Sequence, residues 1–187
     1  AEHLRKYLDH ARTVLPNPLA LGPVRLAVDC ANGAMTTVAP ALFRELGFSL
    51  TVIGADPDGR NINKGVGSTH PEKLADIVRR EGHRLGVAFD GDGDRAILVD
   101  GAGRVLDGDH VLLMCARQMK AEGRLRGNAV VATVMSNIGL QLALEKLGIE
   151  LIRTQVGDKY VMEEMQRRHL SLGGEQSGHL IFSDHLF

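Results

Sequence analysis

The order of apolar segments along the chain is the feature that most restricts its fold. Short runs rich in Val, Ile and Leu alternate with longer segments whose apolar residues recur at helical spacing. Strands that alternate with helices in this way are typical of α/β domains with a largely parallel sheet. The order strand, helix, strand, helix, strand, strand occurs once in each half of the chain. We therefore expect two duplicated α/β domains, each with a mixed, mostly parallel sheet flanked by helices.

The first copy of this order follows a helical segment at the start of the chain. Apolar residues share one helical stripe there, namely Leu4, Leu8, Ala11 and Leu15. The expected strands of the first copy are 24–30, 49–54, 85–90 and 96–100, and its first helix is 36–46. Its second helix begins at Thr69-His70-Pro71-Glu72, which fits a capping box with Thr69 as the cap.

The second copy has expected helices at 108–121, 137–147 and 158–168 and expected strands at 128–134, 149–156, 170–176 and 178–182. A Gly-rich turn near 101–108 predicts the domain boundary, which divides the chain into domains 1–103 and 104–187. Because the chain begins with Ala rather than Met and ends soon after the last strand, we expect a piece of a longer protein with an incomplete second domain.

Composition excludes several classes of partner. The chain is 44% hydrophobic and 24% charged, which is ordinary for a folded protein. Its 22 Lys and Arg against 23 Asp and Glu create no positive field, so nucleic acid is not an expected partner. No apolar run approaches the roughly 20 residues that span a bilayer and no signal peptide opens the chain, so we expect no membrane association and a cytoplasmic location. Cys30 and Cys115 are far apart, and we expect buried free thiols.

An acidic loop follows the third strand of the first copy. Asp90, Asp92 and Asp94 are separated by single glycines, Gly91 and Gly93, which let the backbone curl so that the three side chains converge. Carboxylates this close repel one another, and a hard divalent cation with oxygen ligands relieves the repulsion. The sequence therefore predicts a Mg²⁺ site formed by these three aspartates, rather than a solvated Asp-Gly turn.

Other interpretations of the acidic loop differ in their chemistry. An EF-hand needs Gly and Glu at the sixth and twelfth loop positions, where this chain has Arg95 and Gly101, so that interpretation fails. A phosphatase with an aspartate nucleophile is compatible with the motif alone. Arg95 suits contact with a phosphoryl oxygen, and a surface ion pair with one of the aspartates is an equally good interpretation.

The equivalent loop of the second copy is GGEQSGH (173–179). Glu175, Gln176, Ser177 and His179 offer donors and acceptors over a short stretch, as hydroxyl-rich ligands require. Taken alone, this segment also fits a polar hairpin turn without a ligand. Lys159 could supply a cation to a phosphate or sugar, or it could be solvated at the start of a helix. His179 and Lys159 are also candidates for the general acid and base. The equivalent positions suggest that both loops face one cleft.

Five segments carry a family resemblance. They are VDCANGA (28–34), NINKGVGSTHPE (61–72), LGVAFDGDGDRAILVDGAG (85–103), VGDKYVMEEM (156–165) and GGEQSGH (173–179). Together and in this order they closely resemble phosphoglucosamine mutases of the α-D-phosphohexomutase superfamily. The resemblance implies the second domain and most of the third domain of a four-domain enzyme.

The resemblance also implies an activity and a division of roles. It implies that Asp90, Asp92 and Asp94 hold Mg²⁺, with a phosphoserine of the first domain as a further ligand, and that Glu175 and Ser177 hold sugar hydroxyls. The implied reaction interconverts glucosamine 6-phosphate and glucosamine 1-phosphate through that phosphoserine, which lies outside these residues, as does the phosphate-binding fourth domain. Gln176 resembles the glucosamine type. Some relatives carry Lys where this chain has Gln155, which puts a role for a lysine at that position in doubt.

Three alternative interpretations predict different behaviour. A phosphomannomutase or phosphoglucomutase of the same superfamily would prefer another sugar. A phosphatase would hydrolyse its substrate with this chain alone, and a non-enzymatic binding module would bind a sugar phosphate or a metal tightly. The mutase interpretation predicts that this chain alone is inactive and binds Mg²⁺ loosely.

Overall fold

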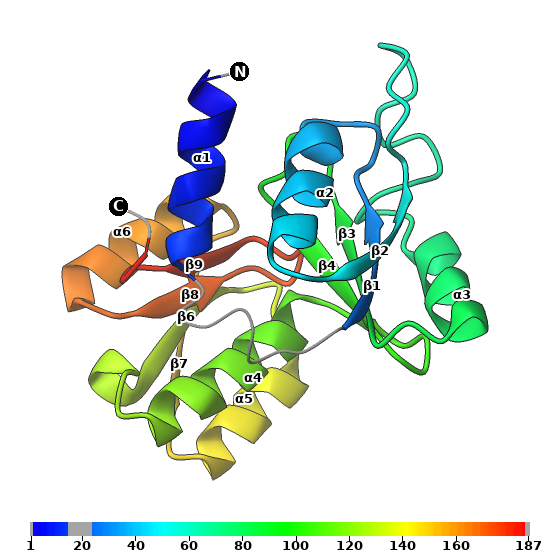
Figure 1. The fold of residues 1–187 in the computed structure, drawn as a ribbon. Helices are drawn as coiled ribbons and strands as arrows, with labels where there is room; N and C mark the ends of the chain where they lie inside the picture. Colours follow the sequence, from blue (N-terminus) through cyan, green and yellow to red (C-terminus); the bar gives the residue numbers. More distant parts are fainter. Residues whose placement is uncertain (1, 15–23, 186–187) are drawn as a thin grey trace. The chain divides into compact units, whose positions relative to one another are not determined.

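A computed structural model describes residues 2–14 and 24–185 (Figure 1). The described residues form two compact units that divide between Val105 and Leu106. Each unit is built on its own sheet, and each sheet contains both parallel and antiparallel pairs. The expected fold class, a mixed and mostly parallel sheet flanked by helices in each half, is confirmed. In the part of the chain that the structure describes, no helix has the length and apolar character to cross a membrane.

Unit 1 contains α1 (Glu2–Thr13), β1 (Arg25–Asp29), α2 (Met35–Glu45), β2 (Ser49–Ile53), α3 (Glu72–Glu81), β3 (Leu85–Phe89) and β4 (Ala96–Asp100). The short β5 (Val105–Leu106) completes its sheet in the order β2-β1-β3-β4-β5. β1 is parallel to both β2 and β3, and β4 returns antiparallel to β3. The first helix is present as expected and buries Leu8, while Leu15 lies outside the described residues.

The core of unit 1 lies on both faces of the sheet. Leu26 and Val28 of β1 pack in the cluster that α2 covers, whereas Ala27 packs in the cluster that α3 covers. This alternation follows from the two-residue period of a strand, which sends successive side chains to opposite faces. Figure 1 shows α2 and α3 beside the strands of this unit. β1 lies between β2 and β3, so the turn after its carboxyl end starts inside the sheet and beside the loop that follows β3.

The predicted capping box at the start of α3 is wrong. The helix begins at Glu72 after Pro71, which already has near-helical dihedral angles, and no side chain caps it. Thr69 lies in a preceding turn, in which His70 N–H donates to Gly67 O (2.9 Å). Proline lacks an N–H and has a fixed φ, so it can start a helix without a capping hydroxyl.

Unit 2 contains α4 (Gly108–Ala121), a 3₁₀ turn (Arg126–Asn128), β6 (Ala129–Thr133), α5 (Ile138–Lys146), β7 (Glu150–Thr154), α6 (Asp158–Arg168), β8 (Leu172–Gly174) and β9 (Leu180–Phe182). Its sheet has the order β7-β6-β8-β9, with β6 parallel to β7 and β8, and β9 antiparallel to β8. β8 and β9 are shorter than predicted because residues 175–178 turn, with Gly178 N–H donating to Glu175 O (3.0 Å).

The core of unit 2 is also divided by its sheet. Val130 and Ala132 of β6 pack with residues of α4 and α5, which lie side by side in Figure 1. Val131 faces the other way and packs with Val161 and Met165 of α6. Every residue of β6 is buried, as expected for a central strand covered on both faces. The strand order therefore repeats that of unit 1, with β6 in the place of β1 and β8 in the place of β3.

Candidate functional site

The acidic loop joins β3 to the antiparallel β4 in unit 1. Asp90, Asp92 and Asp94 each offer a carboxylate oxygen, and these oxygens lie within 4.8 Å of one another. Asp90 is buried, whereas Asp92 and Asp94 are both exposed at the surface of the loop. The three carboxylates therefore converge in the loop, as the sequence predicted. The loop lies at the carboxyl end of a parallel strand, where ligands commonly bind in α/β sheets.

Asp90 is the anchor of the loop. Its Oδ1 accepts hydrogen bonds from the main-chain N–H groups of Gly93 (3.0 Å) and Arg95 (3.2 Å). Its Oδ2 accepts from Nε and Nη2 of the Arg95 side chain, both at 2.7 Å. Arg95 Nε also lies 3.5 Å from Asp94 Oδ1. The ion pair between Arg95 and the aspartates is therefore present, and contact between Arg95 and a phosphoryl group stays a prediction.

The three carboxylates differ in their protonation behaviour. The pKa of Asp92 is raised, because its carboxyl shares a hydrogen bond with Asp90 and faces the negative charges of Asp90 and Asp94. Burial acts to raise the pKa of Asp90, but hydrogen bonds from the Arg95 main chain and from Asp92, and the Arg95 charge, outweigh it and lower that pKa. The negative charges of Asp90 and Asp94 help to raise the pKa of Asp92, and a bound cation would neutralise this repulsion.

The donor set of the loop fits a hard divalent cation. Three carboxylate oxygens on a tight loop are the ligands that Mg²⁺ and Ca²⁺ take in proteins, and Mg²⁺ is commonly held by only a few carboxylates, with substrate phosphate and water as its other ligands. Asp92 and Asp94 are accessible enough to share such an ion with a substrate. The assignment of these aspartates to a metal stays a prediction.

Two segments hydrogen-bond to the main chain of the acidic loop, namely the turn after β1 and the segment before α3. The sequence had indicated no site role for these hydrogen bonds. Ala34 N–H donates to Gly91 O (2.8 Å), and Ser68 N–H donates to Phe89 O (2.8 Å). A Cβ on Gly33 would lie 2.2 Å from Gly91 O, so only glycine permits this approach. The signal was available in the sequence as the Asn-Gly turn after β1 and the Gly-rich segment before α3.

The second loop joins β8 to β9 in unit 2 and is a tight hairpin. Glu175 N–H donates to His179 O (2.8 Å) across its base. The Glu175 carboxylate reaches across to the start of α6, where Oε1 accepts from Gly157 N–H (2.9 Å). Gln176 O accepts from Gly108 N–H (2.9 Å) at the start of α4. Two helix starts therefore fix the shape of this loop.

A cavity of about 240 Å³ lies against the second loop. Glu175, Gln176 and Ser177 line one side of it. Its other walls are side chains that the sequence reasoning missed, Thr133, Met135 and Val156. Thr133 ends β6, Met135 follows it, and Val156 follows β7. The carboxyl ends of these parallel strands lie at the same edge of the sheet, and this topology was the only signal for the three residues in the sequence. The cavity combines polar groups with two largely exposed apolar side chains.

The remaining predicted residues lie differently. His179 Nε2 lies 4.0 Å from Asp158 Oδ2 at the start of α6. Lys159 is directed to its own helix, with Nζ 3.8 Å from Glu163 Oε1 and 6.0 Å from the centre of the Tyr160 ring. Its side chain is 72% exposed, which corresponds to the solvated lysine that the sequence also allowed.

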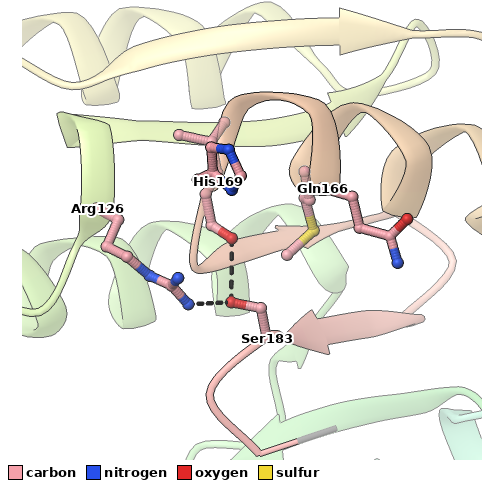
Figure 2. A pocket seen from close by; sticks show the side chains of 6 residues that line it. Arg126, Gln166, His169 and Ser183 are labelled. Carbon is pink, nitrogen blue, oxygen red and sulfur yellow. Dashed lines mark hydrogen bonds between the residues drawn. The ribbon is translucent and has the colours of Figure 1, made fainter. Parts of the chain in front are cut away.

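Another cavity of unit 2, of about 360 Å³, lies at the opposite end of β9 (Figure 2). Figure 2 shows Arg126, Gln166, His169 and Ser183 around it. Arg126 Nη2 donates to Ser183 Oγ (2.5 Å), which in turn donates to Leu170 O (3.0 Å). Arg126 and Ser183 are thus linked to each other, and the lining contains none of the residues predicted to bind substrate or metal.

Family models match both units. Residues 5–103 match domain II, and residues 107–187 match domain III, of the phosphoglucomutase/phosphomannomutase alpha/beta/alpha domains. The chain is 52% identical over 180 residues to the phosphoglucosamine mutase of Thermoanaerobacter pseudethanolicus, an alignment that covers 96% of this chain and 40% of that protein. The chain therefore spans about two fifths of the length of such curated relatives.

Solved structures agree with this relationship. A phosphoglucomutase/phosphomannomutase family protein from Burkholderia thailandensis matches with a TM-score of 0.82 at 27% identity, over 98% of this chain and 40% of that chain. The Aspergillus fumigatus N-acetylphosphoglucosamine mutase in complex with GlcNAc-6P and magnesium matches in fold, with a TM-score of 0.70 at 22% identity, over 96% of this chain and 40% of that chain. Both halves of the sequence and the fold they form lead to one conclusion: the chain belongs to the phosphoglucomutase/phosphomannomutase family, and its two units match domains II and III of that family.

Proposed function

We propose that the chain is part of an enzyme that interconverts glucosamine 6-phosphate and glucosamine 1-phosphate by phosphoryl transfer. The observation that carries this proposal is that the carboxylate oxygens of Asp90, Asp92 and Asp94 lie within 4.8 Å of one another. The chain that contains them is 52% identical to a phosphoglucosamine mutase, in an alignment that covers 40% of that mutase. In this proposal, the donor of the phosphoryl group is a phosphoserine outside residues 1–187, so this chain alone has no turnover.

The three aspartates of the acidic loop would hold Mg²⁺. Their oxygen donors and their mutual repulsion suit this ion, and a protein of the same fold binds magnesium together with a sugar phosphate. When bound, Mg²⁺ would neutralise charge on the transferring phosphoryl group. Asp90 would act mainly as the anchor, because four hydrogen-bond donors already converge on its carboxylate.

Arg95 would stabilise the transferring phosphoryl group. Its guanidinium is held beside Asp90 and Asp94 at the rim of the loop, and its side chain is 40% exposed. A planar guanidinium matches phosphate oxygens as a fork, and an arginine already oriented by carboxylates needs little reorganisation to act. We propose that Arg95 donates to the phosphoryl oxygens while Asp90 keeps its side chain in place.

The second loop would orient the sugar. Glu175, Gln176 and Ser177 line the cavity of about 240 Å³, and their donors and acceptors can pair with sugar hydroxyls that leave water. The hydrogen bond from Gly157 N–H to Glu175 Oε1 fixes the carboxylate before the substrate binds. Pre-organisation of this kind lowers the cost of ordering the site on binding.

The specificity for glucosamine is the finer part of the proposal. Gln176, at the cavity, resembles the glucosamine type. A phosphomannomutase or phosphoglucomutase specificity is the alternative within the same family, because the family models describe those activities as well. A phosphatase would use an aspartate of the same loop as the nucleophile and would hydrolyse the phosphate ester.

One set of assays separates these functions. The full-length protein that contains this chain is assayed with Mg²⁺ on glucosamine 6-phosphate, glucose 6-phosphate and mannose 6-phosphate, and the 187-residue chain is assayed in parallel. Asp92→Asn is the test variant. Asp100→Asn is its control, because it removes a carboxylate charge at the far end of β4, away from the acidic loop.

We expect conversion of the glucosamine substrate, its loss in Asp92→Asn, full activity in Asp100→Asn and no turnover by the chain alone. Preference for another sugar would reassign the substrate. Release of inorganic phosphate by the chain alone would replace the mutase with a phosphatase.

A further inference from the structure

Asp29, the last residue of β1, is completely buried and uses both carboxylate oxygens on main-chain donors. Oδ1 accepts from Ala31 N–H (2.9 Å), two residues further along the chain. Oδ2 accepts from Gly67 N–H (2.8 Å), which is 38 residues away. A buried carboxylate must have such partners, because an unpaired charge in the protein interior is strongly unfavourable. Asp29 thus ties the turn after β1 to the segment before α3.

The two segments that Asp29 joins are the same two that support the acidic loop. The turn after β1 contributes the hydrogen bond from Ala34 N–H to Gly91 O (2.8 Å). The segment before α3 contributes the hydrogen bond from Ser68 N–H, next to Gly67, to Phe89 O (2.8 Å). Each contact therefore falls within one residue of Asp90, the anchor of the loop.

In both supporting segments, the turn after β1 and the segment before α3, the backbone has unfavourable dihedral angles that hydrogen bonds from elsewhere must stabilise. Ala31, Asn32 and Asn63 have φ values of 55°, 50° and 57°, in the left-handed region that residues other than glycine rarely occupy. Such conformations persist where the surroundings over-determine them. The hydrogen bonds to Asp29, together with that from Asn63 N–H to Ala31 O (2.9 Å), supply this constraint.

The supporting segments and the acidic loop are packed too closely to admit an additional methyl group. A Cβ on Gly67 would lie 2.7 Å from Phe89 O, and a Cβ on Gly33 would lie 2.2 Å from Gly91 O. Backbone meets backbone at both places, so no flexible side chain can absorb a shift. A displacement of the supporting segments must therefore move the residues that flank Asp90.

We propose that Asp29 is a positioning residue that sets the geometry of the acidic loop through these two segments, and thereby its affinity for a divalent cation. Both carboxylate oxygens of Asp29 are used by main-chain N–H groups, so in this proposal it acts through the two segments and not as a ligand of the cation. The inference rests on the proposed function for the identity of the metal, while the mechanical part, from Asp29 to the acidic loop, stands on the contacts alone.

The test uses Asp29→Asn in the 187-residue chain. Asparagine keeps the size of the side chain, but it offers one acceptor oxygen and turns an NH₂ group towards one of two N–H donors, so one of the two hydrogen bonds is lost. Asp100→Asn is the matched control, because Asp100 accepts from Ala102 N–H and Arg104 N–H at the end of β4 remote from the acidic loop.

Two readouts are measured on each variant. Mn²⁺, as a probe of the metal site, is titrated by calorimetry, and hydrogen exchange is followed by NMR at Ala34 N–H, Ser68 N–H and the central strand amide of Val28. We expect Asp29→Asn to weaken Mn²⁺ binding on the order of tenfold, as the loss of outer supporting groups does at metal sites. We expect faster exchange at Ala34 and Ser68, unchanged exchange at Val28, and no change of either kind in Asp100→Asn.

The outcomes separate this inference from the proposed function. Unchanged Mn²⁺ affinity and unchanged exchange in Asp29→Asn would overturn the inference, as would faster exchange at all three amides, which would mean a general loss of stability. If the wild-type chain binds no Mn²⁺ but Asp29→Asn speeds exchange only at Ala34 and Ser68, the positioning role stands and the metal part of the proposed function fails.

If Asp29→Asn does not fold, Gly54→Ala replaces it, because a Cβ at Gly54 would lie 2.4 Å from Asp29 Oδ1 and displaces the same carboxylate. The same two readouts then decide the question.

Discussion

Replacing Gly108 by alanine would place a methyl group 1.9 Å from the main-chain oxygen of Glu175. Gly108 is the first residue of α4, and its N–H donates to Gln176 O (2.9 Å) in the loop between β8 and β9. Gly178 N is also close, 3.0 Å from the position of the added Cβ. The substitution therefore pushes the start of α4 and the predicted sugar-binding loop apart.

The size of the effect follows from these distances. Carbon and oxygen make optimal contact near 3.5 Å, so the helix and the loop must separate by about 1.5 Å. A movement of that size breaks the hydrogen bond to Gln176 O, which contributes about 1 kcal/mol, and the crowding adds about 1–3 kcal/mol. The higher helix propensity of alanine offsets less than about 1 kcal/mol of this. We expect the free energy of unfolding of unit 2 to fall by about 1–4 kcal/mol.

The chain offers a simple optical assay for unit 2. It has no Trp and only two Tyr, Tyr7 in unit 1 and Tyr160 in unit 2, so a Tyr7→Phe background leaves Tyr160 as the single fluorescent reporter. Urea titrations compare Gly108→Ala with Gly101→Ala in that background. The control adds a Cβ whose nearest neighbour, His83 O, is 3.3 Å away in unit 1.

We expect the unfolding midpoint reported by Tyr160 to fall in Gly108→Ala and to stay unchanged in Gly101→Ala. An unchanged midpoint in Gly108→Ala would refute the close packing of α4 on residues 175–178. A fall of equal size in both variants would show that the two units do not unfold independently.

Three further predictions concern unit 2. Leu144→Ala, at a fully buried position, should lower the free energy of unfolding by about 2–5 kcal/mol in the same urea titration. Hydrogen bonds from Arg167 lower the pKa of Glu164 from 4.5 to about 2. The ionised form thus stabilises the fold above pH 4.5, and that stability is lost as the pH falls towards 2. Thermal unfolding should therefore show Glu164→Gln to be less stable than the wild type at neutral pH, by a difference that shrinks over this window. Glu175→Gln weakens the acceptor for Gly157 N–H and should weaken glucosamine 6-phosphate binding to the full-length protein without changing Mn²⁺ affinity, both measured by calorimetry.

Sequence periodicity predicted the longer strands because apolar residues mark their buried positions, but it did not predict the two-residue β5. The alternation of Leu26, Ala27 and Val28 between two faces follows from strand geometry alone, and the five-residue β6 is apolar because helices cover both of its faces. The acidic loop was predictable for a related reason, since Asp90 follows directly after such a strand and its partners are within five residues.

Features that depend on distant parts of the chain could not be predicted in the same way. Asp29 ends a strand, and its partner Gly67 is 38 residues away, so no local pattern indicates its role. Met135 and Val156 follow strands like ordinary core residues, yet they are 60% and 56% exposed beside a cavity. The direction of the Lys159 side chain depends on Glu163, one helical turn further on.

Each sheet is built from one uninterrupted stretch of chain, and this has a consequence for synthesis. The last strand of the first sheet ends at Leu106, before α4 begins at Gly108. Domains generally fold as units, the N-terminal one first, while the ribosome is still adding residues. The acidic loop can therefore reach its final shape before the strands that carry the second loop have left the ribosome, and a translational pause after the first sheet would favour its correct assembly.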